Sequence, residues 1–126
     1  MNKKNFSLLI TDRNRHVCEF LKREMASEGY SVQIAISCKE IIKLIYNNNI
    51  PDILVLDPDL PDVYEPALLK TIFEKTGNIP IVLHTLNMDD SKKLLWLNIA
   101  GIIEKNETSI ETLKDVILHI TKEYCL

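Results

Sequence analysis

Short apolar runs alternate with longer amphipathic stretches along the chain, and this alternation constrains the fold more than any other feature of the sequence. The runs have the length of β-strands, and the stretches carry apolar residues at the three- and four-residue intervals of an α-helix. Strands that alternate with helices pair in parallel through right-handed crossovers, so helices must cover both faces of the sheet. The sequence therefore predicts a doubly wound α/β sandwich.

The run Ile53-Leu54-Val55-Leu56 supports this interpretation, because a strand without polar alternation is typical of the covered centre of a parallel sheet. Four further strands are expected, at residues 6–11, 31–35, 81–84 and 101–104. Five helices are expected, around residues 17–25, 37–45, 68–73, 89–98 and 108–124. The predicted fold class is a flavodoxin-like sandwich of five βα units with strand order 2-1-3-4-5.

Local signals mark the ends of several helices. Ser37 with Glu40, and Thr108 with Glu111, have the spacing of a capping box, which satisfies free backbone N–H groups at a helix start. Gly29 is expected to stop the first helix, because glycine readily adopts the left-handed conformation that ends many helices.

Composition limits the class of protein. A length of 126 residues with 46% hydrophobic and 26% charged residues fits a single domain, residues 1–126. The formal net charge of -3 provides no broad positive field, which argues against direct nucleic-acid binding. Cys18, Cys38 and Cys125 are widely spaced and are expected to be reduced thiols in a cytoplasmic protein. No apolar run has the length of a signal peptide or membrane span, so no membrane contact is expected.

Polar side chains follow several of the expected strands. Ligands of doubly wound sheets bind outside the carboxyl ends of the strands, where the strand order reverses. At these ends the sequence places Asp12, Arg13, Asp57, Thr85 and Lys105. Taken singly, each has an ordinary interpretation as a turn former or a solvated surface residue. Their convergence on one crevice makes them candidate functional residues.

Five ordered segments resemble the receiver domains of response regulators, and together they cover nearly the whole chain. Ile10-Thr11-Asp12-Arg13 is similar to the end of the family's first strand. Residues 51–57 are similar to its acceptor strand, and residues 57–61 to the loop that follows. Residues 79–85 are similar to the strand with the switch threonine, and residues 100–105 to the strand with the lysine. The resemblance implies a stand-alone, chemotaxis-type response regulator of a two-component phosphorelay.

The resemblance also implies a role for each residue of the crevice. Asp57 would accept the phosphoryl group from a histidine kinase or phosphotransfer protein. Asp12 and Asp57 would bind Mg²⁺, with a backbone carbonyl from Asp59. Thr85 would hydrogen-bond the phosphoryl oxygens, and Lys105 would contact the acyl phosphate. An aspartate that attacks phosphorus needs such cations, because two anions must approach each other. Such a domain is no conventional enzyme and at most catalyses its own phosphorylation and dephosphorylation.

Arg13 departs from the family pattern, which has a second acidic metal ligand at this position. The change adds two units of positive charge and is expected to weaken Mg²⁺ binding. Either the Asp59 side chain turns toward the metal, or the guanidinium pairs with Asp57 or Asp12 in place of the metal. Two functions therefore stay open: a phosphoryl-accepting receiver, and a phosphorylation-independent pseudo-receiver that binds a protein partner with Arg13 replacing the metal.

Three further positions depart from the pattern. Glu65 stands at a usual glycine, so the loop is expected to follow another path, since a positive φ would be strained there. Ile102 replaces an aromatic residue that moves inward in many relatives upon phosphorylation, so an output switch must use other groups. Asn106 replaces a proline, and a trans Lys105–Asn106 peptide is expected, because a non-proline cis bond costs roughly 2.5 to 4 kcal/mol.

The segment Leu94-Leu95-Trp96-Leu97 is more apolar than one buried helix stripe requires, so at least one large side chain is expected to face outward. The resemblance implies partner or dimer contacts on the face of the fourth helix, fifth strand and fifth helix. A downstream protein partner, or a second copy of the chain, is therefore expected to bind around Leu94, Trp96 and Ile102.

Two enzyme classes fit the sequence less well. A flavodoxin-like FMN or nucleotide enzyme needs backbone amides that cradle phosphate after the first strand, yet no glycine lies in that loop. Clustered acids such as Asp89-Asp90 might suggest glycosidase chemistry, but they are more commonly solvated caps and turns. His84 lacks the spacing of a metal ligand and is interpreted as a packed strand residue.

Overall fold

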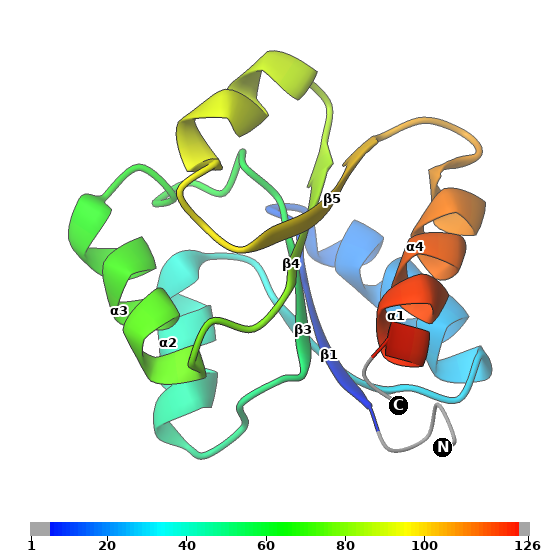
Figure 1. The fold of residues 1–126 in the computed structure, drawn as a ribbon, viewed down its shortest axis with the longest axis horizontal. Coiled ribbons are helices and arrows are strands. Elements are labelled where there is room, and N and C mark those ends of the chain that lie inside the picture. The colour runs from blue at the N-terminus through cyan, green and yellow to red at the C-terminus, as the bar shows by residue number, and fades with distance from the viewer. Residues whose placement is uncertain (1–5, 124–126) are drawn as a thin grey trace.

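The computed structural model describes residues 6–123 and shows a five-stranded parallel sheet with helices on both faces (Figure 1). The strands are β1 (Ser7–Thr11), β2 (Ser31–Ala35), β3 (Ile53–Leu56), β4 (Ile81–Thr85) and β5 (Ile99–Glu104). The helices are α1 (Arg15–Ser27), α2 (Cys38–Tyr46), α3 (Pro66–Thr76), the 3-10 helix η2 (Met88–Leu94) and α4 (Ser109–Glu123). The strand order β2-β1-β3-β4-β5 confirms the predicted flavodoxin-like topology.

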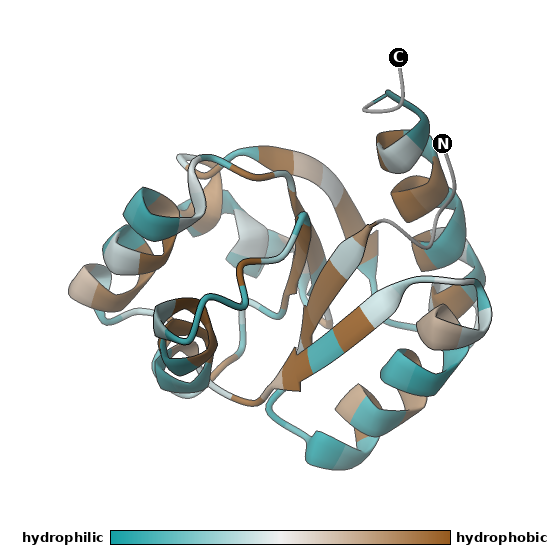
Figure 2. Ribbon diagram, turned by 90° about the horizontal axis from the view of Figure 1, so that it is seen from below, coloured by the Kyte–Doolittle hydropathy of each residue, from teal (hydrophilic) through white to brown (hydrophobic). Residues whose placement is uncertain are grey.

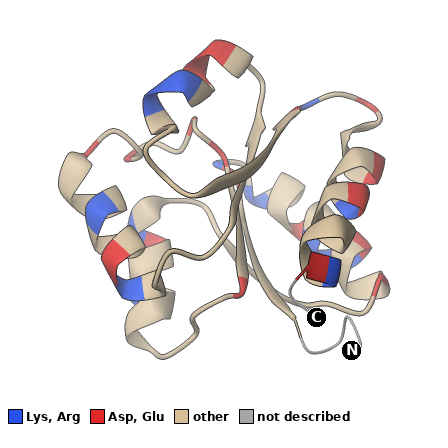
Figure 3. Cartoon of the chain, viewed as in Figure 1, with Lys and Arg blue, Asp and Glu red and all other residues tan. Residues whose placement is uncertain are grey.

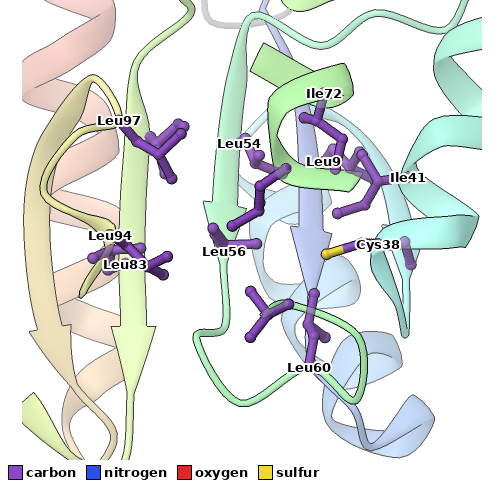
Figure 4. Close-up of a cluster of buried hydrophobic side chains, with 14 of the residues drawn as sticks. Leu9, Cys38, Ile41, Leu54, Leu56, Leu60, Ile72, Leu83, Leu94 and Leu97 are labelled. Atoms are coloured by element: carbon purple, nitrogen blue, oxygen red, sulfur yellow. The ribbon is translucent and has the colours of Figure 1, made fainter. Parts of the chain in front are cut away.

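The two faces of the sheet bury separate clusters of apolar side chains. Helices α1 and α4 cover one face, whereas α2, α3 and η2 cover the other (Figure 1). Strand β3 contributes Ile53 and Val55 to the first cluster and Leu54 and Leu56 to the second, which Figure 4 shows. Successive side chains of a strand point to opposite faces, so a strand covered on both sides needs an unbroken apolar run.

The charged residues lie mainly on helices and loops, and the strands are almost free of them (Figure 3). The helices carry both hydrophobic and hydrophilic segments along their length, as amphipathic helices do (Figure 2). No helix within residues 6–123 is long and apolar enough to cross a membrane. The carboxyl ends of the parallel strands meet at one edge of the sheet, the upper edge in Figure 1, and this edge positions the candidate site.

The predicted capping box at Ser37 forms in part, because Glu40 accepts from the N–H of Ile36 and not from that of Ser37, the N-cap residue. The Glu40 N–H donates to Ser37 Oγ at 3.1 Å, and Glu40 Oε1 accepts from the Ile36 N–H at 2.8 Å. The second capping box is wrong, because the Thr108 hydroxyl donates to Asn106 Oδ1 at 3.0 Å. Asn106 Oδ1 also accepts from the Thr108 N–H at 2.9 Å, so an asparagine turn leads into α4 instead.

Backbone conformations agree with three predictions. Gly29 follows the end of α1 with a φ of 101°, as expected for a residue that stops a helix. Glu65 has a φ of -80°, so it avoids the strained positive φ, as the sequence predicts. Within the described residues no peptide bond is cis, which confirms the trans Lys105–Asn106 bond.

The helix between β4 and β5 differs from its prediction. The sequence predicts an α-helix over 89–98, whereas the structure has a 3-10 helix that ends at Leu94. Residues 95–97 form a turn and bend after this helix, so they do not lie on a helical stripe. Leu94 and Leu97 are buried (Figure 4), while Leu95 and Trp96 are 58% and 53% exposed. The prediction of an outward apolar side chain is confirmed, but the placement of Leu94 on the outer face is wrong.

Both cysteines in the described range are free and buried. Burial is the largest cause that raises the pKa of the Cys18 thiol to about 11 and that of Cys38 to about 12. Thiols in such surroundings stay protonated and unreactive. Cys125 and the predicted end of the last helix at residue 124 lie outside the described residues.

Candidate functional site

Asp57 follows β3 directly and is 1% exposed, at the edge where the sheet's strands end. Its N–H donates to Thr11 Oγ1 at 2.9 Å, and the Thr11 hydroxyl donates to the Val55 carbonyl at 2.9 Å. Asp57 Oδ1 accepts from the Asp59 N–H at 2.9 Å. The backbone and side chain of Asp57 are therefore both fixed. Sequence reasoning missed Thr11, whose only signal is a hydroxyl at the end of an apolar strand.

Lys105 lies between two buried carboxylates. Its Nζ is 2.6 Å from Asp12 Oδ2 and 3.1 Å from Asp57 Oδ2, and its own side chain is 16% exposed. The Lys105 N–H donates to the Thr85 carbonyl at 2.7 Å, which ties the end of β5 to the end of β4. Burial alone would lower the pKa of Lys105, but the hydrogen bond to Asp12 and the charge of Asp57 outweigh it and raise that pKa. Lys105 is therefore a firmly protonated cation in contact with Asp57.

Asp12 is held on both of its oxygens. Oδ1 accepts from the Asn14 N–H at 2.8 Å, and Oδ2 accepts from Lys105. The residue is 4% exposed, so its charge is largely removed from solvent. A buried carboxylate requires a cation or several hydrogen bonds, and Asp12 has both.

Arg13 pairs with neither Asp57 nor Asp12. Its Nη1 lies 3.3 Å from Asp59 Oδ2, and the two side chains are 56% and 57% exposed. Of the two arrangements that the sequence leaves open for Arg13, the pairing of the guanidinium with Asp57 or Asp12 is not the one in this structure. The Arg13 side chain instead lies at the mouth of the crevice, where it is partly exposed to solvent and contacts the loop after β3.

Thr85 is 1% exposed, but its hydroxyl is engaged away from Asp57. The hydroxyl donates to the Asn87 carbonyl at 2.9 Å and accepts from the Asn87 N–H at 3.1 Å. The structure thus brings Asp12, Asp57 and Lys105 into direct contact, and Arg13 with Asp59 beside them. Thr85 stands at the same strand end with its side chain turned to its own loop.

A pocket of about 470 Å³ opens above these residues. Its polar wall contains the predicted residues Asp12, Arg13, Asp57, Asp59 and Lys105. Its apolar wall comes from α1 and the start of α4. This volume lies within the range of small-molecule sites in proteins.

His84 also lines this pocket and is 3% exposed, which confirms that it is a packed strand residue. Its Nε2 lies 3.1 Å from Ser109 Oγ, while Nδ1 has no hydrogen-bond partner within the described part of the chain. Burial, followed by the charge of Lys105, lowers the pKa of His84 to about 4, so the imidazole is neutral at pH 7. The sequence indicates that His84 lies near the site, because His84 directly precedes Thr85.

Of the three residues of the predicted partner surface, Trp96 and Ile102 are exposed and Leu94 is buried. Trp96 packs against Phe73 of α3 with ring centroids 5.9 Å apart, and Ile102 on β5 is 37% exposed. Trp96 thereby lines a mostly apolar groove of about 590 Å³ between α3 and η2. Leu94 lies in the core beneath, as described above.

Comparison with known proteins identifies the family. The response regulator receiver domain matches residues 8–117, and this chain belongs to that family. The response regulator MprA of Mycobacterium sp. (strain KMS) is 31% identical over 91 residues, which is 72% of this chain and 39% of that protein. The probable transcriptional regulator ycf27 of Cyanidium caldarium is 29% identical over 100 residues, 79% of this chain and 39% of that protein. The chain thus spans about two-fifths of these curated relatives.

Solved structures show the same fold. A two-component response regulator from Clostridium difficile has 26% sequence identity and a TM-score of 0.79, with 94% of this chain and 97% of that chain covered. A CheY-like receiver domain protein from Methanospirillum hungatei JF-1 has 21% identity and a TM-score of 0.77, with 94% and 96% covered. This chain is therefore a receiver domain of two-component signalling, a signalling module and not a conventional enzyme.

Receiver domains typically bind Mg²⁺, and the oxygen donors of this site fit that ion. Within residues 6–123 no group of three or more His, Cys, Asp or Glu side chains is arranged to hold a metal. Mg²⁺, however, commonly uses only one or two protein carboxylates together with phosphate oxygens. Asp12 and Asp57 converge on one ammonium group and provide such a pair. The Asp59 carboxylate is held by Arg13.

Proposed function

We propose that this receiver domain accepts a phosphoryl group on Asp57 from a histidine kinase or phosphotransfer protein and signals through a protein partner. The observation that carries the proposal is the position of Lys105, 3.1 Å from the buried carboxylate of Asp57. A fixed positive charge in contact with the nucleophile lowers the repulsion between two anions as they react. A water-poor site strengthens that effect.

The transfer step uses groups that are already in place. A carboxylate oxygen of Asp57 forms a bond to phosphorus, while the bond between phosphorus and the donor nitrogen breaks. The electron pair stays with the donor imidazole, which takes a proton from solvent. The Asp59 N–H orients the Asp57 carboxylate, and Lys105 neutralises charge that spreads over the phosphoryl oxygens.

Three further roles belong to the proposal. Asp12 and Asp57, with a backbone carbonyl from Asp59, would hold Mg²⁺, which supplies a Lewis acid for the phosphoryl oxygens. Arg13 would weaken the affinity for that ion by repulsion. Thr85 would exchange the Asn87 carbonyl for a phosphoryl oxygen, because a hydroxyl group rotates readily to a new acceptor.

The proposed output is a protein contact on the exposed apolar side chains near η2 and β5. Leu95, Trp96 and Ile102 supply that surface, for a downstream partner or a second copy of the chain. Isolated exposed apolar residues are common, but neighbouring ones mark interaction sites more often. The proposal includes a cytoplasmic location, with which the free thiols of Cys18 and Cys38 agree.

A second candidate is a phosphorylation-independent receiver that acts only as a protein-binding module. The cations around the site favour it, because Lys105 contacts both Asp12 and Asp57, while Arg13 pairs with Asp59. Each carboxylate thus has a cationic partner without any metal, and one net negative charge is left. The two candidates differ in their response to Mg²⁺ and to phosphoryl donors.

Incubation with Mg²⁺ and a small phosphodonor such as phosphoramidate, followed by intact mass, tests the proposal. We expect one added phosphoryl group on the wild-type chain and none on Asp57→Ala. Asp52→Ala is the matched control, because Asp52 is exposed and lies five residues before the acceptor, and it should be modified like the wild type. An unmodified wild-type chain would contradict the proposal and favour the second candidate.

A Mg²⁺ titration separates the candidates independently of phosphorylation. A ligand that binds the native state raises its melting temperature, and Trp96 fluorescence offers a second readout. We expect stabilisation of the wild type at high Mg²⁺ and of Arg13→Asp at lower Mg²⁺, since this substitution restores an acidic ligand. Indifference of both proteins to Mg²⁺ would support the second candidate.

A further inference from the structure

Arg13 and Asp59 form the one ion pair within the described residues that borders the pocket without reaching the buried carboxylates. Only Nη1 of the guanidinium touches Asp59 Oδ2, at 3.3 Å, and both side chains are more than half exposed. Exposed pairs with a single contact contribute little to stability, because water and salt compete for both partners. The other donors of the guanidinium fork remain free for a better acceptor.

The pair lies directly beside the acceptor. Asp59 is joined to Asp57 by the 2.9 Å hydrogen bond from its N–H to Asp57 Oδ1, and Arg13 follows Asp12 in the chain. Arg13, Asp57 and Asp59 all line the same pocket. A group bonded to the Asp57 carboxylate therefore enters the space that Arg13 borders.

Phosphorylation changes the charge that faces Arg13. The carboxylates of Asp12, Asp57 and Asp59 are opposed by only two cations, Arg13 and Lys105, so the cluster begins with one excess negative charge. A phosphoryl group replaces one carboxylate charge by roughly two negative charges on three strong acceptor oxygens. The planar guanidinium fork matches phosphate oxygens with two parallel hydrogen bonds, which a single carboxylate oxygen does not offer.

We infer that Arg13 binds the phosphoryl group on Asp57 and releases Asp59 when it does so. This inference rests on the proposed phosphorylation of Asp57. Before phosphorylation Arg13 is paired with Asp59, and after it Arg13 binds the phosphoryl group. Arg13 then has a role in addition to weakening Mg²⁺ binding. The exchange also couples the state of Asp57 to the loop after β3, because the Asp59 side chain loses its partner.

Four variants test the exchange, with the rate of phosphorylation by phosphoramidate at saturating Mg²⁺ as the readout, so that differences in Mg²⁺ affinity do not enter the rate. Arg13→Gln should slow the reaction roughly tenfold, the size of one charge-assisted hydrogen bond. Asp59→Asn should speed it about threefold, the scale of an exposed ion pair, because it frees Arg13. The double variant should be as slow as Arg13→Gln alone. Arg15→Gln is the matched control, since Arg15 forms a similar exposed pair with Glu40 at 3.2 Å outside the pocket, and it should not change the rate.

The double variant separates exchange from simple charge effects. If Asp59 acts only as a nearby negative charge, Asp59→Asn speeds the reaction equally with and without Arg13, and that result would overturn the inference. Side-chain nitrogen NMR gives a second readout, in which the Arg13 guanidinium signal should shift upon phosphorylation. A phosphorylated wild type with an unaffected Arg13→Gln would overturn the inference alone. An unmodified wild type would overturn both the inference and the proposed function.

Discussion

Lys105 and Lys114 both face acidic side chains from distant parts of the chain, but the two clusters differ in burial. The carboxylates beside Lys105 are those of Asp12 and Asp57, with side chains 6% and 1% exposed. The glutamates within 4 Å of Lys114 are more open, with exposed fractions of 33% for Glu24, 36% for Glu28 and 74% for Glu111. The lysines themselves are equally covered, at 16% and 18% exposed.

The comparison teaches that the burial of the acids, more than the exposure of the lysine side chains, distinguishes the candidate site from a surface cluster. The pKa of each lysine is raised, and for Lys114 the hydrogen bond to Glu24 is the largest cause. For Lys105 the hydrogen bond to Asp12 and the charge of Asp57 must first overcome burial. Water can replace Lys114 beside its glutamates, but it cannot easily reach the buried aspartates. The Lys105 cluster therefore holds charge that only another cation could neutralise.

Replacing each lysine should give the largest difference in stability between the two clusters. Lys105→Met should lower the free energy of unfolding by roughly 3 to 5 kcal/mol, because two buried carboxylates lose their cation. Lys114→Met should cost clearly less, since its glutamates are solvated. Urea unfolding at pH 7 measures both. Equal losses for the two variants would contradict the distinction.

His84 should make the stability of the protein depend on pH, because burial and the charge of Lys105 lower its pKa. Its pKa is about 4 in the folded chain and near 6.5 when unfolded, so the unfolded state binds a proton first as the pH falls. The contribution of His84 to the free energy of unfolding should therefore be constant above about pH 7 and fall toward pH 4, by up to roughly 3 kcal/mol.

The pH slope of His84 can be isolated by substitution. His84→Leu should flatten the fall of stability between pH 7 and pH 5 relative to wild type, whatever its effect at pH 7. His119→Gln is the control, because His119 is exposed on α4. Lys105→Met should also flatten the slope, since it removes a charge that lowers the His84 pKa. An unchanged slope in His84→Leu would show that other groups cause the acid response.

Coupling energies test whether Lys105 acts through Asp57. Combined with Asp57→Asn, Lys105→Met should cost about 1 to 2 kcal/mol less than it does alone, because one buried charge has already been removed. The matching cycle of Lys114→Met with Glu24→Gln should give a smaller coupling. Urea unfolding of the single and double variants supplies the values. A coupling near zero would mean that the interaction between Lys105 and Asp57 does not contribute to stability.

Ionic strength should give the smallest difference between the two lysine clusters. Raising the ionic strength from about 0.1 M to about 1 M shortens the Debye length from roughly 10 Å to 3 Å and screens exposed charges most. The cost of Lys114→Met should therefore shrink, while the cost of Lys105→Met should change little. A strong salt effect at Lys105 would indicate that water reaches Asp12 and Asp57.

The fold and the central contact follow from the sequence, because both depend on topology. An unbroken apolar run predicts the buried strand β3, and parallel strands bring Asp12, Asp57 and Lys105 to one edge. Asp12 and Asp57 follow the adjacent strands β1 and β3, whereas Lys105 follows β5, beyond β4, and its long side chain spans the distance to both carboxylates.

Side-chain orientation and helix type do not follow from the sequence in the same way. Thr85 and Arg13 each had several acceptors in reach, and local loop geometry directs them to Asn87 and Asp59. Residues 95–97 form a turn and bend after η2 in place of the predicted end of an α-helix, so the exposure of Leu95 and Trp96 did not follow from an α-helical pattern.

Chemical location of the phosphoryl group tests the central claim most directly. After treatment with Mg²⁺ and phosphoramidate, borohydride reduction converts an aspartyl phosphate to homoserine, which peptide mass spectrometry assigns to one position. We expect homoserine at position 57 in the wild type and none in Lys105→Met at the same reaction time. Homoserine at position 12 or 59, or its absence from the wild type, would contradict the assignment of Asp57 as the acceptor.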